Sequence, residues 1–315
     1  MFTEKRLMFL YAVSPVHMGT GTSLGVIDNP VQRERHTEHP ILAGSGLKGA
    51  ARELAESKAG ISDFSKDDVT KIFGPDTNAS DHAGAVSFSD GQLVAFPVRS
   101  LRQGYVYATS PIALERLKRL AKLVGIDASG WQLSEPSDDE AVVLDDKLVV
   151  ENKLVLESYE YKWKEGNNTG FKIIANWLAD NALPKEEGYS FFKEKLKNHL
   201  VLLSENQFSY FVRNATVVEP HVRINDVTGT AEEGGLFFTE NVPPESLFVS
   251  LVMASQERKK KGDNDKNYLN ASEVMEKLQN VLHDTLLQIG GDATTGRGQM
   301  LVRFVNKEDN SNEDA

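Results

Sequence analysis

The sequence predicts an α+β domain, because apolar strands, amphipathic helices and glycine-rich loops alternate along the chain. The first observation is the apolar run over residues 5–15, which ends at a proline as a buried strand often does. The second is a pair of similar strands at 246–254 and 300–305, separated by an amphipathic helix. With a further helix after the first strand, this order suits a ferredoxin-like fold, which RNA-recognition modules also use.

Bulk composition limits the class of protein. The chain has 315 residues, enough for a sizeable core in one large domain with insertions or in two ordinary domains. It has no cysteine, which excludes disulfides, zinc fingers and thiol catalysis and leaves oxygen or imidazole groups as ligands of any metal. No apolar run approaches the roughly 20 residues that span a bilayer, and the charged N-terminus is unlike a signal peptide. We therefore expect a cytoplasmic protein without a membrane partner.

The charge distribution leaves room for an anionic partner, although the net charge is −11. Basic domains are the usual nucleic-acid binders, so the total charge by itself argues against RNA or DNA. The acidic residues, however, gather at 134–146 and in the tail 306–315. Basic residues instead lie around the glycine loops: Arg33, Arg35, Lys48, Arg52, Arg99, Arg102 and Arg297. Because a groove can be locally positive on an acidic protein, a polyanion is the first ligand to consider.

A long loop and a helix follow the first strand. The loop runs from His17 to Pro40, and loops of this length inside a compact domain are usually functional or disordered. Ser45 is a plausible N-cap of the helix that comes next. Helical spacing leaves Lys48 and Arg52 one turn apart on one face, away from the apolar face.

The middle of the chain carries further strand and helix signals. Two strand-like stretches, 85–98 and 104–111, surround turn residues, and the amphipathic helix after them is capped by Ser110. Residues 126–170 are polar and acidic with short strand-like runs, and we interpret them as a polar insertion on the main domain. A helical stretch over 171–203 completes this part of the chain.

Residues 218–244 predict an extended β-hairpin arm, or thumb. They contain an alternating strand, a DVTGT turn, a second turn at EEGG and a short aromatic strand that two prolines end. We expect both faces of the arm to be polar, so that it has little reason to be buried in its own subunit. Residues 306–315 are predicted to form an acidic, disordered tail.

Two glycine-rich loops combine turn glycines, hydroxyls and cations, a composition that can bind phosphate through the backbone. One surrounds the sequence GSGLKGAAR and the other is IGGDATTGRG. The first is not an ATP-binding P-loop, because Gly49 follows Lys48 where that motif requires serine or threonine. The glycines of the second loop have an alternative role, which is only to turn the chain tightly.

Four motifs carry a resemblance that spans nearly the whole chain. They are PVHMGTGTSLGVIDNPVQRERH, GSGLKGAAR, RINDVTGTAEEGGLFFTENVPPESLF and IGGDATTGRG, in this order. Together they closely resemble the RAMP superfamily, and within it the repeated backbone subunit of type III-B CRISPR effectors, the Cmr complexes. The resemblance implies a single RAMP domain over residues 1–315 with a ferredoxin-like palm and a thumb.

The resemblance also implies a function. Backbone subunits of this family stack head to tail along a guide RNA together with other Cmr subunits, and their thumbs interrupt the guide–target duplex at regular intervals. They cut the single-stranded target RNA beside each thumb. The family's cleavage aspartate matches Asp28, which the resemblance makes the metal-binding and catalytic residue, with Mg²⁺ or Mn²⁺ as cofactor. His17 matches a position near the cut, and Lys48 one that meets the guide backbone.

The chemistry also follows from RNA itself, which carries its own nucleophile in the 2′-hydroxyl. A single carboxylate can serve by recruiting a divalent metal or by helping the 2′-proton to leave. Arg33, Arg35 or His36 can then neutralise the phosphate. At the thumb tip, Glu232 and Glu233 are candidates to assist the cut. The remaining predicted RNA contacts are Ser45, Lys48, Arg52, Gly296, Arg297 and Gly298.

Each candidate has an ordinary structural alternative. Asp28 precedes Asn29 and Pro30 and is a respectable turn residue without any catalytic role. Lys48 and Arg52 suit a solvated helix face equally well. Three functions therefore stay open: an RNA-guided endoribonuclease subunit, a non-catalytic protein that coats guide RNA, and a metabolic hydrolase with a polar loop site.

Overall fold

Four antiparallel strands form the centre of the fold in the computed structural model, which describes residues 1–21, 27–60, 64–77, 82–166, 168–259 and 268–306. They are β1 (Glu4–Ala12), β4 (Gly91–Arg99), β13 (Leu247–Ala254) and β15 (Gln299–Val305). β1 lies between β13 and β15, and β4 pairs with the other edge of β13. Helix α1 (Gly44–Lys58) follows β1 and α7 (Ala271–Leu282) follows β13. This order of strands and helices is ferredoxin-like, which confirms the predicted fold class.

The central sheet is buried on both faces, as the continuous apolar pattern of β1 requires. Met8 and Leu10 of this strand belong to one hydrophobic cluster with residues of α1 and α7. Phe9 and Tyr11 belong to a second cluster on the opposite face, with residues of α3 (Pro111–Leu123) and α4 (Thr169–Asn181). The helices therefore cover the sheet as two separate layers.

Helix α1 begins two residues earlier than predicted and is not capped by Ser45. Its N-cap is Ala43, whose side chain makes no cap hydrogen bond. The Gly44 N–H instead donates to the Asp90 carboxylate at 2.7 Å, so a residue from the turn before β4 satisfies the end of the helix. Ser45 lies exposed in the first turn. The predicted cap at Ser110 is confirmed, since its hydroxyl accepts from the Ala113 N–H of α3.

Residues 126–170, which we interpret from the sequence as an insertion, extend the main sheet. β10 (Leu200–Leu202) pairs with β5 (Tyr105–Thr109) and with β6 (Glu140–Val143), which joins this region to the centre. Leu154, Leu156 and Tyr161 of this region are buried in the core beside the central strands. The remaining elements are β2 (Ile41–Leu42), α2 (Lys66–Phe73), β3 (Val86–Phe88), β7 (Val149–Val150), β8 (Lys153–Leu156), β9 (Tyr159–Trp163), α5 (Ser190–His199), α6 (Glu205–Asn214) and β14 (Thr285–Gln288).

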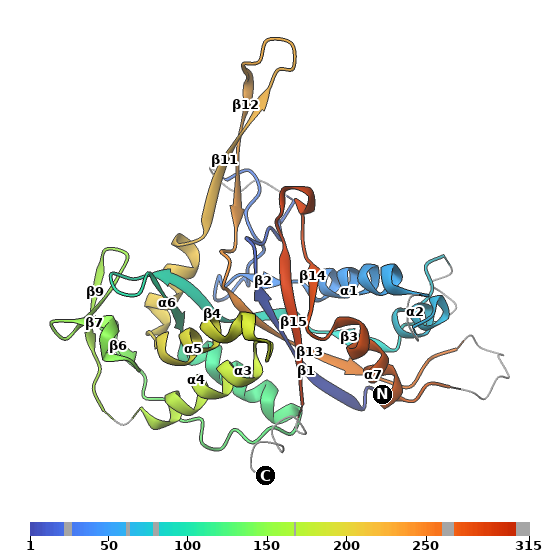
Figure 1. Cartoon of the computed structure of the whole chain (residues 1–315), viewed down its shortest axis with the longest axis horizontal. Helices are drawn as coiled ribbons and strands as arrows, with labels where there is room; N and C mark the ends of the chain where they lie inside the picture. The colour runs from blue at the N-terminus through green and yellow to red at the C-terminus, as the bar shows by residue number, and fades with distance from the viewer. Residues whose placement is uncertain (22–26, 61–63, 78–81, 167, 260–267, 307–315) are drawn as a thin grey trace.

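The predicted arm is a two-stranded sheet of its own, which projects away from the palm (Figure 1). It consists of β11 (Val217–Ile224) and β12 (Ala231–Asn241). The pairing shifts between Val222 and Ile224, so that residues 232–235 of β12 bulge out of the ladder where the second turn was predicted.

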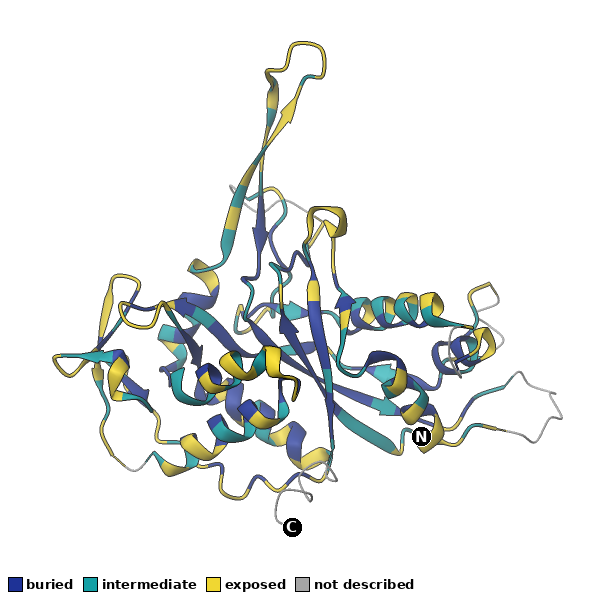
Figure 2. Ribbon diagram, viewed as in Figure 1, coloured by how far each residue is buried: buried dark blue, intermediate teal, exposed yellow. Residues whose placement is uncertain are grey.

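The faces of the arm differ from the prediction that both are polar. Val218 and Val222 of β11 are each 45% exposed and Leu236 of β12 is 57% exposed. These residues share one face, because Val222 pairs directly with Leu236 and side chains alternate along a strand. The opposite face carries the polar side chains of Glu219, His221 and Thr239 together with Phe237. The arm is therefore amphipathic, and Figure 2 shows its exposure increasing from the palm to the tip.

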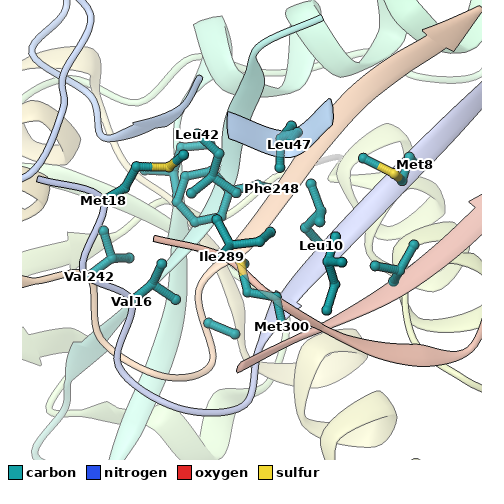
Figure 3. Packing of buried hydrophobic residues seen from close by; sticks show 14 of the residues in the cluster. Met8, Leu10, Val16, Met18, Leu42, Leu47, Val242, Phe248, Ile289 and Met300 are labelled. Atoms are coloured by element: carbon teal, nitrogen blue, oxygen red, sulfur yellow. The ribbon is translucent and has the colours of Figure 1, made fainter. Parts of the chain in front are cut away.

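The loops at the foot of the arm are anchored in the core (Figure 3). Val16 and Met18 of the first loop, Val242 at the end of the arm and Ile289 after β14 belong to the same cluster as Leu10. Within the described ranges, no helix is both long and apolar enough to cross a bilayer. The predicted tail lies outside the described residues from position 307 onward.

Candidate functional site

Three segments that are far apart in the sequence meet at the foot of the arm. The first loop pairs with the outer edge of β12 through isolated bridges at Asn29–Thr239 and Val16–Val242. The loop after β14 binds the first loop in turn, because the Gly291 N–H donates to the His17 carbonyl at 2.9 Å. Gly290 has a φ of 81°, and a Cβ there would lie 2.2 Å from the same carbonyl oxygen. Only glycine fits this position.

A polar cavity of about 490 Å³ lies between these segments. It carries cationic, anionic and neutral hydrogen-bonding groups together with two imidazole rings and one phenyl ring. Its lining residues are His17, Asn29, His221, Phe237, Thr239, Gly291, Asp292, Thr295 and Arg297. The cavity therefore has the composition of a site for a phosphate and an attached ring.

Asp28 is exposed beside this cavity and is fixed by the arm. Its backbone N–H donates to the Phe238 carbonyl at 3.1 Å, and the Phe238 N–H donates to its Oδ2 at 2.7 Å. The other carboxylate oxygen, Oδ1, has no hydrogen-bond partner in the described part of the chain. The carboxylate is thus held in one orientation and keeps one oxygen for a ligand.

His17 is in the cavity wall, but both of its ring nitrogens are engaged. Nδ1 donates to the Glu240 carbonyl at 2.7 Å, because a carbonyl can only accept. Nε2 then accepts from the Asn29 amide at 2.8 Å. The ring is also buried, with 4% of its residue surface exposed. In this arrangement His17 supports the loop that carries Asp28 and has no free nitrogen for proton transfer.

Arg33 forms a buried ion pair at the arm's foot. Its guanidinium lies 2.5 Å from Oε1 of Glu240, a carboxylate with only 4% of its side chain exposed. It also donates to the backbone carbonyls of Glu38 and Val212. Glu240 further accepts from the Val31 N–H and the Thr216 hydroxyl. Through these contacts Arg33 joins the first loop to the arm, so its guanidinium is not free to bind RNA.

We expect Glu240→Ala to lower the free energy of unfolding by about 3–5 kcal/mol, because it leaves the Arg33 charge buried without its partner. This corresponds to a fall in Tm of roughly 5–8 °C, measured by calorimetry of the purified chain. Glu232→Ala on the same strand is the control, since Glu232 makes only a loose 3.8 Å contact with Arg223. Equal Tm values for the two variants would contradict a structural role for Glu240.

The basic residues of α1 form a second group, and neither Lys48 nor Arg52 lines the cavity. Burial, and then the charges of Arg52 and Arg258, lower the pKa of Lys48 from its ordinary value. Lys48 has no ion-pair partner among the described residues, whereas Arg52 pairs with Glu56 and Asp76. Lys48 is thus the less neutralised of the two cations. Arg35 is exposed and likewise unpaired within the described chain.

The other predicted residues are divided between the cavity and the arm. Arg297 lines the cavity and pairs with Glu219 of β11 at 2.5 Å. Gly296 is exposed with a φ of 80° and open space around it, whereas a Cβ on Gly298 would lie 2.1 Å from the Ile289 carbonyl. Gly298 therefore serves the close packing of its own loop. Glu233 is exposed in the bulge, beyond the stretch of β12 that holds Asp28.

Sequence reasoning missed the residues that the arm contributes to the cavity. His221, Phe237 and Thr239 line it together with Asn29 of the first loop. The signal that could have found them is the alternation of β11 and β12, because His221 pairs with Phe237 and therefore shares a face with Thr239. That pairing depends on the register, which the bulge obscures in the sequence.

A divalent metal fits this site only as a partly solvated ion. Among the described residues, no group of three or more His, Asp or Glu side chains is placed to hold a metal. Mg²⁺ commonly keeps several waters and binds one or two carboxylates plus substrate phosphates. Oδ1 of Asp28 is compatible with that mode of binding.

The fold and the site define an α+β palm protein whose projecting arm carries one wall of a polar cavity of about 490 Å³. The chain belongs to the RAMP superfamily, whose family model matches residues 9–301. It is 34% identical over 307 residues to the CRISPR system Cmr endoribonuclease Cmr4 of Pyrococcus furiosus, with 97% of each chain covered.

Solved structures with the same fold include two informative ones. The crystal structure of oligomeric Cmr4 from Pyrococcus furiosus has a TM-score of 0.71 at 26% identity, with 96% of this chain and 98% of that chain covered. A chain of the type III-B Cmr-beta structure bound to cognate target RNA has a TM-score of 0.69 at 19% identity, with coverage of 96% and 98%. At that identity the second likeness shows the fold alone.

Proposed function

We propose that this protein is an endoribonuclease subunit of a type III-B CRISPR effector, which coats a guide RNA and cuts the bound target RNA at regular intervals. The observation that carries this proposal is the carboxylate of Asp28, which the arm holds beside a polar cavity with one oxygen free. The named relative is a Cmr endoribonuclease at 34% identity over nearly the whole chain. Both point to RNA cleavage at the foot of the arm.

The proposed assembly is a head-to-tail filament of this chain on the guide RNA, together with other Cmr subunits. The arm supports it, because it projects from the palm and exposes Val218, Val222 and Leu236. A heterologous contact of this kind repeats from copy to copy and does not close. The crystal structure of the Pyrococcus furiosus relative is described as oligomeric, which agrees with a repeated subunit.

We propose Mg²⁺ or Mn²⁺ as the cofactor, which Oδ1 of Asp28 would hold. When bound, the metal neutralises charge that develops on the phosphate. Asp28 orients toward the reacting 2′-hydroxyl and helps its proton to leave. Arg297 lies in the same cavity, and its guanidinium N–H groups beyond the one paired with Glu219 suit a phosphate oxygen.

The direct test is a complex assembled from purified subunits, guide RNA and end-labelled target RNA. The proposed function requires a ladder of products with constant spacing that depends on the guide. The alternative is a non-catalytic subunit that only coats the guide; it would protect the RNA from external nuclease and give no ladder. A metabolic hydrolase would co-purify without RNA of defined length.

Guide binding gives a separate prediction. We expect Lys48→Ala to weaken binding of every guide sequence and to flatten the dependence of log K on log salt by about 0.7, which corresponds to one lost contact with single-stranded RNA. Fluorescence anisotropy over a range of salt concentrations measures both. Lys122→Ala is the control, because Lys122 is exposed on α3, and this helix covers the face of the sheet opposite to α1. A change in base preference with an unaltered slope would contradict a phosphate contact.

A further inference from the structure

The polar cavity contains two histidines with different hydrogen-bonding states. His17 uses both ring nitrogens within the protein, on the Glu240 carbonyl and the Asn29 amide. His221 uses one, since its Nε2 lies 2.9 Å from the Thr239 hydroxyl. Its Nδ1 has no hydrogen-bond partner within the described ranges of the chain. Of the two histidines, His221 is therefore the one with a nitrogen available to a ligand.

The ring of His221 is also held in a defined plane. It stacks on Phe237, with the ring centroids 5.0 Å apart and the planes inclined by 18°. The hydrogen bond between Nε2 and the Thr239 hydroxyl fixes the direction in which the ring points within that plane. Such an oriented imidazole with one nitrogen free is the usual arrangement of a general acid or base.

His221 and Asp28 lie on opposite sides of β12. Asp28 bonds to the outer edge of this strand at Phe238, and His221 pairs across the inner edge with Phe237. Two strand spacings separate their backbones, which is about 10 Å. Asn29, the neighbour of Asp28, lines the same cavity as His221, so a phosphodiester bound across this part of β12 would lie within reach of both groups.

We propose that His221 is the general acid of RNA cleavage, an inference that rests on the proposed function. The 2′-oxygen attacks the phosphorus and its proton passes to the carboxylate of Asp28. The bond from phosphorus to the 5′-oxygen breaks, and Nδ1 of the His221 imidazolium gives its proton to that oxygen. The products are a 2′,3′-cyclic phosphate and a 5′-hydroxyl, so atoms and charge balance without a further reactant.

Several charged groups lie around His221. Glu219 and Arg223 flank it along β11, and Arg297 and Asp292 face it across the cavity. Arg297 is paired with Glu219, which leaves the two charges largely cancelled.

The decisive experiment uses a target RNA with sulfur in place of the bridging 5′-oxygen at one cleavage position. A thiolate leaves without a proton, so this substrate does not need the acid. We expect His221→Gln to slow cleavage of the oxygen substrate by about 10²–10⁴-fold and that of the sulfur substrate by less than about tenfold. Asp28→Asn should slow both. His82→Gln, at a surface position bonded to the Ala83 carbonyl, should slow neither.

Each result decides something definite. Wild-type cutting of the oxygen substrate by His221→Gln overturns the role of His221 and leaves the proposed function standing. An equal loss on both substrates also overturns it, because a merely structural histidine would not distinguish the leaving atoms. If the wild-type complex cuts neither RNA, the proposed function fails and the inference falls with it. Target binding by each variant, measured in parallel, verifies that the complexes are assembled.

Discussion

Asp28→Asn is expected to lower target cleavage in the assembled complex by at least about 10³-fold while guide and target binding stay at wild-type values. The asparagine oxygen can still accept the Phe238 N–H, so the loop keeps its place on the arm. What is lost is the negative charge that would hold a divalent ion and assist removal of the 2′-proton. Single-turnover cleavage of labelled target, with binding measured separately, gives both quantities.

The control for Asp28 is Asp127→Asn, because Asp127 is an exposed carboxylate whose described hydrogen bonds are local, to the backbone and side chain of Ser129. The complex with Asp127→Asn should cleave target RNA at the wild-type rate. Removal of divalent ions with a chelator should reproduce the Asp28→Asn defect in the wild-type complex. Wild-type rates for Asp28→Asn in excess Mg²⁺ would show that another group makes the cut.

Deletion of Asp226–Gly235 is expected to abolish the regular cleavage ladder and to leave a folded chain. The deletion joins Asn225 to Leu236, so the Val222–Leu236 pair is closed by a three-residue loop, a length that hairpins tolerate. It removes the exposed tip and bulge and no member of either hydrophobic cluster. Without the tip, the guide–target duplex is no longer interrupted beside Asp28, and the phosphate does not reach an in-line geometry.

Full-length target RNA and circular dichroism measure the two parts of this expectation. The matched control is Val227→Thr, which keeps the arm's length and changes a side chain that is 93% exposed. It should retain the ladder. An unchanged ladder from the deletion would demonstrate that the tip does not position the cut, and unfolding of the variant would contradict the expectation that the palm folds without the tip.

The sequence predicted the elements whose causes are local. The apolar run of β1, the two C-terminal strands and the arm with its second turn at 232–235 follow from periodicity and turn residues over a few positions. The Ser110 cap was found for the same reason, since its partner Ala113 lies three residues away. Such features need no knowledge of the rest of the chain.

The missed features depend on contacts between distant residues. Asp90 replaces Ser45 as the partner of the α1 terminus, and Glu240 engages Arg33 from 207 residues away. An arginine beside a glycine loop looks like a phosphate ligand until its carboxylate partner is known. The candidate site also depends on contacts between residues that are far apart in the sequence. Asp28 was named through a family likeness, whereas the cavity face of His221 depends on the register of the arm, which only the structure gives.

The clamp on Asp28 has a consequence for which substitutions the protein can tolerate. Both hydrogen bonds that hold this residue on β12 use the main chain of Phe238 and none of its side chain. Substitutions at position 238 therefore leave both hydrogen bonds to Asp28 intact for every residue type that has an amide hydrogen. Proline alone lacks that hydrogen and would remove the Oδ2 contact. The side chain at this position can consequently differ in size and polarity between related proteins, while the Asp28 carboxylate keeps the same orientation.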